Sequence, residues 1–313
     1  MTRSQICQVP TLNRREFLGH TTVAAALGLV AGPAGILSTQ AAETGVKPAV
    51  GSNVFGWTQY YKRDKKEFNQ DEVIAALADC GYDYLENFLD LNVPEKNAEF
   101  AEKLKARGMR PVSLYCGPAL HEADKYQATV EKILAAGKIC AKAGFEVFSL
   151  NAAPIKREKT DEELKTQVKA MTELGTGLKA LGIRLGIHHH LPEMTNQARE
   201  FHYNFKNSDP ASVGFCYDVH WVYKGGISPQ DTLAQYANRV VTWHLRQGRE
   251  GVWWEDLDTG DVDYTWVSQY AHKHKMPLRL TVELALEAKT VITRSAVENH
   301  RRSREFVKRV FGV

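Results

Sequence analysis

The sequence predicts an α/β protein that is a single (β/α)8 TIM barrel, and three observations favour this fold. Strand-like and helix-like patterns alternate from about residue 51 to the C-terminus, as in a parallel sheet wrapped by helices. Helical patterns end at Gly81, Gly108, Gly144 and Gly182, each followed by a strand. Without its first 42 residues the chain has 271 residues, close to the ~250 residues of one such barrel. A doubly wound open sheet is the alternative, but no G-x-G-x-x-G motif opens any helical pattern.

The first half of the barrel contains four strand–helix pairs. We expect strands at Asn53–Gln59, Asp83–Phe88, Arg110–Cys116 and Glu146–Asn151, and helices at Gln70–Cys80, Pro94–Arg107, Glu122–Ala143 and Asp161–Leu181. The first of these helices is amphipathic, because its apolar residues between Val73 and Leu77 fall on one face.

The second half contains four strands that each end in a potential metal ligand. They are expected at Leu185–His190, Val213–Asp218, Val240–His244 and Leu278–Glu283. The final helix is expected at Val291–Val310, with basic residues in its last turns that suit the helix dipole. The longest irregular segment, residues 247–263, follows the seventh strand and is a candidate lid at the catalytic mouth.

The N-terminal 42 residues are predicted to be a twin-arginine export signal. Arg14 and Arg15 precede Phe-Leu, an apolar run follows, and small residues lead to Ala41 and Ala42, where cleavage is expected. An uncleaved membrane anchor is the alternative, but the apolar run is short for a span of ~20 residues and contains Gly and Pro. The mature protein is therefore expected in the periplasm or another extracytoplasmic space.

A linker over residues 43–50 is expected to lead into a catalytic domain of residues 51–313. The formal net charge of the whole chain is +3 and falls to about +1 after signal removal, because the signal carries three arginines and one glutamate. No basic excess then favours nucleic acid or an anionic membrane. We expect a small-molecule carbohydrate partner, no nucleic acid and no membrane for the mature form, while the sequence leaves the oligomeric state open.

The ligand-bearing strand ends indicate a metal site. All strand C-termini of a (β/α)8 barrel open onto one face, so widely spaced residues converge there. The candidates are the histidines at 188–190, Asp218, His244 and Glu283. Glu283 lies in an apolar strand, where an unpaired ionised carboxylate would be costly. Two imidazoles and two carboxylates suit one divalent cation, with Mn, Co, Zn, Fe or Mg all admissible.

Strand periodicity orders the neighbouring polar residues. His188 and His190 are two apart and are expected to point together, with His189 turned away. Asp218 and His220 are also two apart and are expected on one side. For each of these, a hydrogen-bonded core residue or a rim ion pair is the alternative.

Four further residues are candidates for substrate binding. Trp221 could stack on a sugar face or serve as ordinary loop packing, and Arg246 could hold a substrate oxygen or a neighbouring acid. Glu86 and Asn151 end the second and fourth strands on the same face, where each either contacts substrate or makes a structural contact.

These motifs resemble the xylose isomerase-like TIM barrels, the sugar phosphate isomerase/epimerase superfamily. The resemblance is strongest at His188–Glu193, Tyr217–Trp221, Trp243–Arg246 and Val282–Glu283. It implies that one divalent cation is bound by His188, Asp218, His244 and Glu283. Many members have Glu at the position of His188, so this chain resembles the His-x-His branch.

The resemblance also bears on the mechanism. In the family's epimerases two metal-bound glutamates exchange a carbon-bound proton, and His188 removes one of them. The base is then expected among Glu283, His190, Glu193 and His220. The family's Lys is replaced by Arg246-Gln247, and an arginine suits orientation better than proton transfer.

The leading hypothesis is an isomerase or epimerase that acts on a sugar or keto-sugar through a metal-stabilised enediolate. The alternatives are a lyase or hydratase that eliminates from a 3-keto-glycoside, and a non-catalytic sugar-binding barrel. A DNA-repair enzyme resembling endonuclease IV is opposed by the export signal and the near-neutral charge. The sequence identifies neither the sugar nor the metal.

Overall fold

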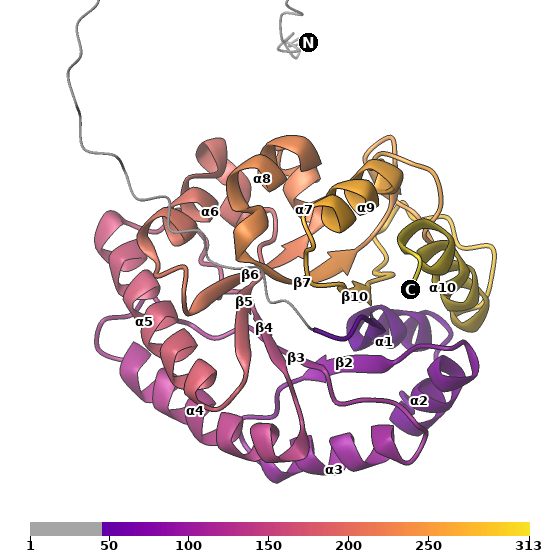
Figure 1. Cartoon of the computed structure of the whole chain (residues 1–313), viewed down its shortest axis with the longest axis horizontal. Coiled ribbons are helices and arrows are strands. Elements are labelled where there is room, and N and C mark those ends of the chain that lie inside the picture. The colour runs from indigo at the N-terminus through magenta and orange to yellow at the C-terminus, as the bar shows by residue number, and fades with distance from the viewer. Residues whose placement is uncertain (1–45) are drawn as a thin grey trace, which may run out of the picture. The chain divides into compact units, whose positions relative to one another are not determined.

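In this computed structural model, which describes residues 46–313, eight parallel strands close into a barrel surrounded by helices (Figure 1). The strands follow one another around the barrel in the order β1-β10-β7-β6-β5-β4-β3-β2, which confirms the predicted fold. Their bounds are β1 (Ala49–Asn53), β2 (Tyr84–Phe88), β3 (Ser113–Cys116), β4 (Val147–Leu150), β5 (Arg184–Ile187), β6 (Val213–Asp218), β7 (Val240–Leu245) and β10 (Arg279–Val282).

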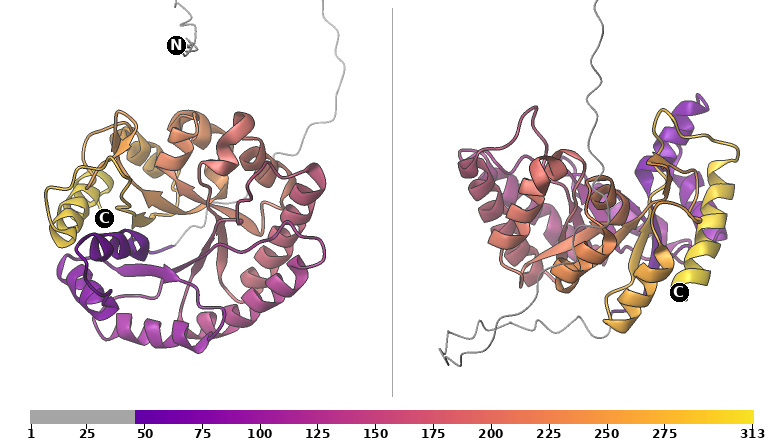
Figure 2. Two further views of the ribbon diagram at one scale, coloured as in Figure 1. Left: turned by 180° about the vertical axis from the view of Figure 1, so that it is seen from behind. Right: turned by 90° about the horizontal axis from the view of Figure 1, so that it is seen from above.

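The helices form the outer layer of the barrel. They are α1 (Val54–Arg63), α2 (Gln70–Asp79), α3 (Glu95–Lys105), α4 (Tyr126–Ala143), α5 (Asp161–Ala180), α6 (Thr195–Asn207), α7 (Val219–Lys224), α8 (Pro229–Tyr236), α9 (Tyr264–Lys273) and α10 (Ala296–Phe311). The C-terminal helix α10 contacts α2 and β1, so the two ends of the barrel domain meet (Figure 2). The glycines predicted as C-caps at 81, 108, 144 and 182 all have positive φ.

The first strand was predicted at Asn53–Gln59, and this prediction is wrong because the strand lies earlier. β1 begins at Ala49, inside the segment expected to be a linker, and pairs with β10 from the register Ala49↔Arg279 onward. The chain turns into α1 because the Asn53 side chain accepts a hydrogen bond from the Phe55 amide and caps the helix. The aromatic and apolar residues that follow suit a buried helix face as well as a strand.

Other boundaries differ as well: β3 begins at Ser113 rather than Arg110, and α4 begins at Tyr126 rather than Glu122. β5 ends at Ile187, before the three histidines, which therefore lie in the loop that follows. The final helix begins at Ala296 rather than Val291, because Ser295 caps it by accepting a hydrogen bond from the Glu298 amide. The candidate lid is partly ordered: it contains the small antiparallel pair β8 (Gly248–Arg249) and β9 (Val252–Trp253).

Polar side chains occupy the barrel interior near the strand C-termini. Glu86, Ser113, Ser149 and Thr281 are fully buried. Since buried polar groups need partners, these residues form hydrogen bonds to one another and to the residues above them, and so fix the floor of the catalytic face. The remaining core between sheet and helices is apolar.

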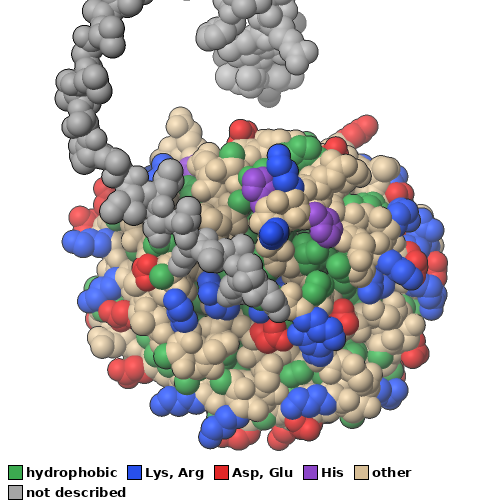
Figure 3. Space-filling model, viewed as in Figure 1, with side chains coloured by type: hydrophobic (Ala, Val, Ile, Leu, Met, Phe, Trp, Pro, Cys, Tyr) green, Lys and Arg blue, Asp and Glu red, His purple; other side chains and the backbone are tan. Residues whose placement is uncertain are grey.

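Acidic and basic side chains are interspersed over the face of the molecule seen in Figure 3. None of the helices between residues 46 and 313 has the length and hydropathy needed to cross a bilayer. The predicted twin-arginine signal, residues 1–42, lies outside the described residues.

Candidate metal centre

Four side chains from four strand ends converge at the C-terminal end of the barrel. They are His188, Asp218, His244 and Glu283, all buried, and each offers a ligand atom within 4.8 Å of the others. His188 Nε2 lies 3.4 Å from Asp218 Oδ2, and His244 Nδ1 lies 2.8 Å from Glu283 Oε2. The structure thus brings together the four residues that the sequence predicts as ligands; their role as ligands stays a prediction.

The chemistry of these atoms fits a divalent cation. Three buried atoms of the centre lack a hydrogen-bond partner among the described residues. They are Nδ1 and Nε2 of His188 and Oδ2 of Asp218. Buried polar atoms without partners are costly, and one divalent cation would satisfy a ring nitrogen of His188 together with Oδ2 of Asp218. His188, Asp218, His244 and Glu283 would hold that ion.

Both carboxyl groups of the centre are kept ionised. Burial disfavours the charged form, but the Arg246 guanidinium and the neighbouring histidines outweigh it and hold the pKa of Glu283 and of Asp218 below the ordinary values. The centre therefore presents two carboxylates, the charge state that a metal site requires.

Arg246 spans the centre and the substrate side. Its Nη2 forms an ion pair with Glu283 Oε1 and lies 3.9 Å from Asp218 Oδ2. Its guanidinium carbon sits 3.9 Å above the ring of Trp253 and 5.6 Å from that of Trp221. Nη1 has no hydrogen-bond partner within residues 46–313, so this nitrogen is free to bind a ligand oxygen.

Glu86 lies beneath the centre and not in the cavity, which favours the structural contact over the substrate contact among its two expected roles. It is fully buried, and its carboxylate accepts hydrogen bonds from Asn53 Nδ2 at 2.8 Å, from Ser149 Oγ at 2.9 Å and from Ser113 Oγ. Its Oε1 is also 2.9 Å from Nε2 of His244. Such a carboxylate behind a histidine fixes the ring orientation and makes the opposite nitrogen a better ligand.

His190 faces the cavity in a defined tautomer. The Asn151 amide nitrogen donates to the His188 carbonyl at 3.1 Å, so its Oδ1 is the atom that faces His190 Nδ1, also at 3.1 Å. Nδ1 must then carry the proton, and Nε2 keeps its lone pair. Burial lowers the pKa of His190 to about 3, so the ring is neutral at physiological pH. Asn151 therefore positions His190 and does not line the cavity.

The middle histidine of the three points away, as predicted. His189 packs edge-on against Phe201 and Phe205 of α6, and its Nε2 lies 3.2 Å from Asn204 Nδ2. Burial lowers the pKa of His189 well below its ordinary value. It is a core residue behind the centre.

Two of the four expected bases lie outside the cavity. Glu193 accepts a hydrogen bond from the His190 amide at 2.7 Å and is buried on the far side of the loop, where burial raises its pKa to about 7.

The other expected base, His220, follows the residue at which β6 gives way to a helix. Asp218 Oδ1 caps α7 by accepting a hydrogen bond from the Trp221 amide, so the alternation of side chains along the strand ends at Asp218. His220 consequently turns away, with Nε2 3.7 Å from Asp261 Oδ2. Strand periodicity does not extend past Asp218, so the expectation that His220 shares a side with Asp218 is wrong, while its role as a base stays a prediction.

The centre forms one end of a cavity of about 400 Å³ with aromatic walls. Trp221, Arg246, His190, His188 and Glu283 line it, as the sequence analysis expects. The other lining residues were not among the predicted site residues; they are Asn53, Phe55, Gln59, Phe88, Tyr115 and Trp253. Phe55, at the start of α1, and Phe88, at the end of β2, are 42% and 46% exposed, so both present apolar surface at the cavity.

Comparison with protein families gives a match over most of the barrel. The family model described as xylose isomerase-like TIM barrel matches residues 74–310. Two curated relatives are inosose dehydratases: that of Clostridium tetani is 28% identical over 36% of this chain and 39% of its own length, and that of Geobacillus kaustophilus is 22% identical over 59% and 64%. This chain thus matches less than two thirds of the length of either relative.

Solved structures share the fold over nearly their whole length. A sugar phosphate isomerase/epimerase from Parabacteroides distasonis has a TM-score of 0.68 at 20% identity, over 87% of this chain and 98% of its own. The IOLI protein, solved with a bound zinc atom, has a TM-score of 0.64 at 15% identity, over 84% and 98%. At these identities the likeness concerns the fold alone.

Proposed function

The chain belongs to the xylose isomerase-like TIM barrel family, and we propose that within this family it is an exported, divalent-metal-dependent enzyme that enolises a sugar or keto-sugar. The observation that carries the proposal is the convergence of His188, Asp218, His244 and Glu283 at the end of an aromatic cavity. The zinc atom bound to the IOLI protein supports a metal in a barrel of this kind.

The chemistry divides between the ion and the side chains. When bound, a divalent cation supplies a Lewis acid that polarises a carbonyl and stabilises the negative charge of an enediolate. Trp221 offers a flat apolar surface to a sugar ring, and Trp253 holds the Arg246 guanidinium in place beside it. Arg246 Nη1 is free to donate to a substrate oxygen, which orients the ring within the cavity.

We assign proton removal to His190. Both oxygens of Glu283 already have partners, Arg246 and His244, whereas Nε2 of His190 carries a lone pair on the cavity side of the ring. In this step Nε2 takes the proton from the carbon next to the carbonyl, and the electron pair of the C–H bond becomes the enediolate. Asn151 Oδ1 holds the opposite nitrogen and so supports the imidazolium that forms.

The fate of the enediolate separates the two reaction types. Return of the proton gives isomerisation or epimerisation, and loss of a leaving group next to the carbanion gives elimination from a 3-keto-glycoside. The family resemblance favours elimination: with His188 at a position where many members have Glu, the two opposed carboxylates of the family's epimerases are not both present here. The inosose dehydratases among the relatives carry a dehydratase name, which supports the same direction.

Hydrogen exchange tests the proposal. Metal-loaded mature protein is incubated in D2O with ketohexoses and with a 3-keto-glucoside, and NMR follows deuterium at the α-carbon and any eliminated product. We expect exchange or elimination in the wild type and a loss of roughly 10²–10⁴-fold in His190→Gln with the metal retained. His202→Gln is the control, because His202 faces the Tyr236 hydroxyl and does not line the cavity. Undiminished exchange in His190→Gln would remove His190 from the mechanism, and no exchange in the wild type would refute enolisation.

A further inference from the structure

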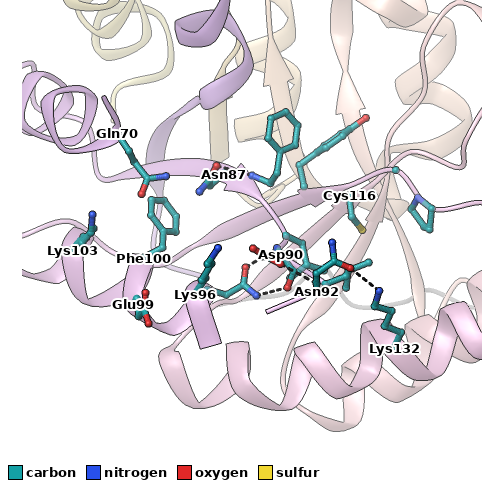
Figure 4. Close-up of a pocket in the computed structure, with 17 residues that line it drawn as sticks. Gln70, Asn87, Asp90, Asn92, Lys96, Glu99, Phe100, Lys103, Cys116 and Lys132 are labelled. Carbon is teal, nitrogen blue, oxygen red and sulfur yellow. Dashed lines mark hydrogen bonds between the residues drawn. The ribbon is translucent and has the colours of Figure 1, made fainter. Parts of the chain in front are cut away.

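A second cavity, of about 750 Å³, shares two lining residues with the metal cavity, and Figure 4 shows the side chains around it. Its walls come from the loops after β2 and β3 and from helices α3 and α4. Phe88 and Tyr115 line both cavities, so the two spaces adjoin at these side chains. Neither the metal centre nor the proposed proton transfer uses this second space.

The wall between the cavities is an aromatic pair. Phe88 and Tyr115 meet edge to face with ring centroids 6.1 Å apart, and the Tyr115 ring lies 5.6 Å from that of His188. Phe88 is 46% exposed, so much of its surface is available to a ligand. An exposed aromatic ring beside a polar cavity matches the apolar face of a sugar ring.

Polar groups in the second cavity have unused hydrogen-bonding capacity. Within residues 46–313, the side chains of Gln70, Lys96 and Glu99 and the amide nitrogen of Asn87 make no hydrogen bond. They present both donors and acceptors, as a ligand with several hydroxyl groups requires. Figure 4 shows these side chains around the cavity, with Lys132 bonded to Asn92 on the opposite side.

The loop that forms the floor of this cavity is held in place. Asn97, which is buried, accepts from the Asp90 amide and donates to the Asp90 and Pro94 carbonyls, each at 2.9 Å. Asp90 in turn accepts from the amides of Asn92 and Val93. Such a loop binds without a large ordering cost, since its conformation is fixed before the ligand arrives.

We propose that the second cavity is a sugar subsite and that the substrate is therefore a glycoside with at least two sugar residues. The residue that reacts occupies the metal cavity, and the glycosidically linked residue stacks on Phe88 and bonds to Asn87 and Lys96. This inference rests on the proposed function, because it extends the same substrate beyond the reacting ring.

Binding of unreacted sugars tests the subsite without turnover. Isothermal titration of the mature protein compares glucose with maltose, cellobiose and trehalose. We expect at least one disaccharide to bind roughly tenfold or more tightly than glucose, the gain of one or two good contacts. Phe88→Ala and Lys96→Ala should each reduce that difference severalfold. Lys105→Ala is the matched control, because Lys105 lies on the same helix but pairs with Glu102 away from the cavity.

The outcomes separate this inference from the proposed function. Equal affinity for glucose and all three disaccharides, or a disaccharide preference that survives both Phe88→Ala and Lys96→Ala, would overturn the subsite. Hydrogen exchange on a monosaccharide could still succeed in that case. Conversely, a disaccharide preference lost in the two variants would support the subsite even if no exchange occurred.

Discussion

Glu86 Oε1 lies 2.9 Å from Nε2 of His244, beneath the four converging side chains. The opposite nitrogen of the same ring faces Glu283 at 2.8 Å, so one imidazole connects a buried carboxylate to the candidate metal centre. Glu86 is itself fixed by Asn53, Ser113 and Ser149. The ring of His244 is therefore oriented by groups that never touch the substrate.

Replacing this carboxylate by an amide should weaken metal binding. Glu86→Gln removes the charge that supports His244, and we expect metal affinity to fall by about 10–100-fold. Competition with a chelating dye measures it. Tyr84→Phe is the control, because Tyr84 also bonds inside the barrel but to Thr281. Unchanged affinity in Glu86→Gln would show that the carboxylate serves the barrel core alone.

The stacking of Arg246 on Trp253 should matter for substrate and not for metal. Trp253→Leu removes the ring 3.9 Å from the guanidinium, and we expect KM to rise roughly tenfold with metal content unchanged. Trp254→Leu is a matched control on the neighbouring position, where the ring stacks on Arg249 and does not line the cavity. Equal effects of the two substitutions would assign the loss to the hairpin as a whole.

Glu193 should make stability depend on pH. Burial raises its pKa in the folded protein to about 7, above the 4.5 of an ordinary glutamate. The stability that the protonated Glu193 side chain contributes to the folded protein is thus fully present below about pH 4.5. It is lost as the pH rises through 7. Relative to Glu193→Gln, the wild type should lose on the order of 3 kcal/mol of unfolding free energy over that window. Urea unfolding between pH 4.5 and 8.5 measures this, and parallel curves for the two proteins would contradict it.

Export is proposed from the sequence and has a direct test. Arg14→Lys/Arg15→Lys should leave the full-length precursor inside the cell, because the twin-arginine pair is the export address. Cell fractionation with N-terminal sequencing should find wild-type protein outside the cytoplasm, beginning near residue 42. Arg3→Lys is the control. Export that continues in the double variant would rule out this route.

The centre could be predicted from the sequence because its residues follow one simple geometric rule. Asp218, His244 and Glu283 each end a recognisable strand, and a closed barrel brings strand ends together whatever their separation in sequence. The opposed directions of His188 and His189 also follow from local alternation, which persists into the loop just past β5.

The residues that were misplaced depend on contacts that local patterns do not encode. Asn53 ends β1 through a cap, and Asp218 ends β6 in the same way, which turns His220 out of strand periodicity. Glu86 is buried under His244 because the partners that stabilise it come from three other strands. Phe88 at the end of β2 and Trp253 in β9 both line the cavity, and no local pattern distinguishes these two aromatic residues from others that pack in the core.

Metal content of the purified mature protein tests the central claim most directly. Elemental mass spectrometry is applied to the wild type and to His188→Ala/Asp218→Ala, after reconstitution with Mn, Co and Zn. The account predicts about one bound metal ion per chain in the wild type and its loss in the double variant. No bound metal in the wild type after reconstitution, or equal metal in both proteins, would contradict it.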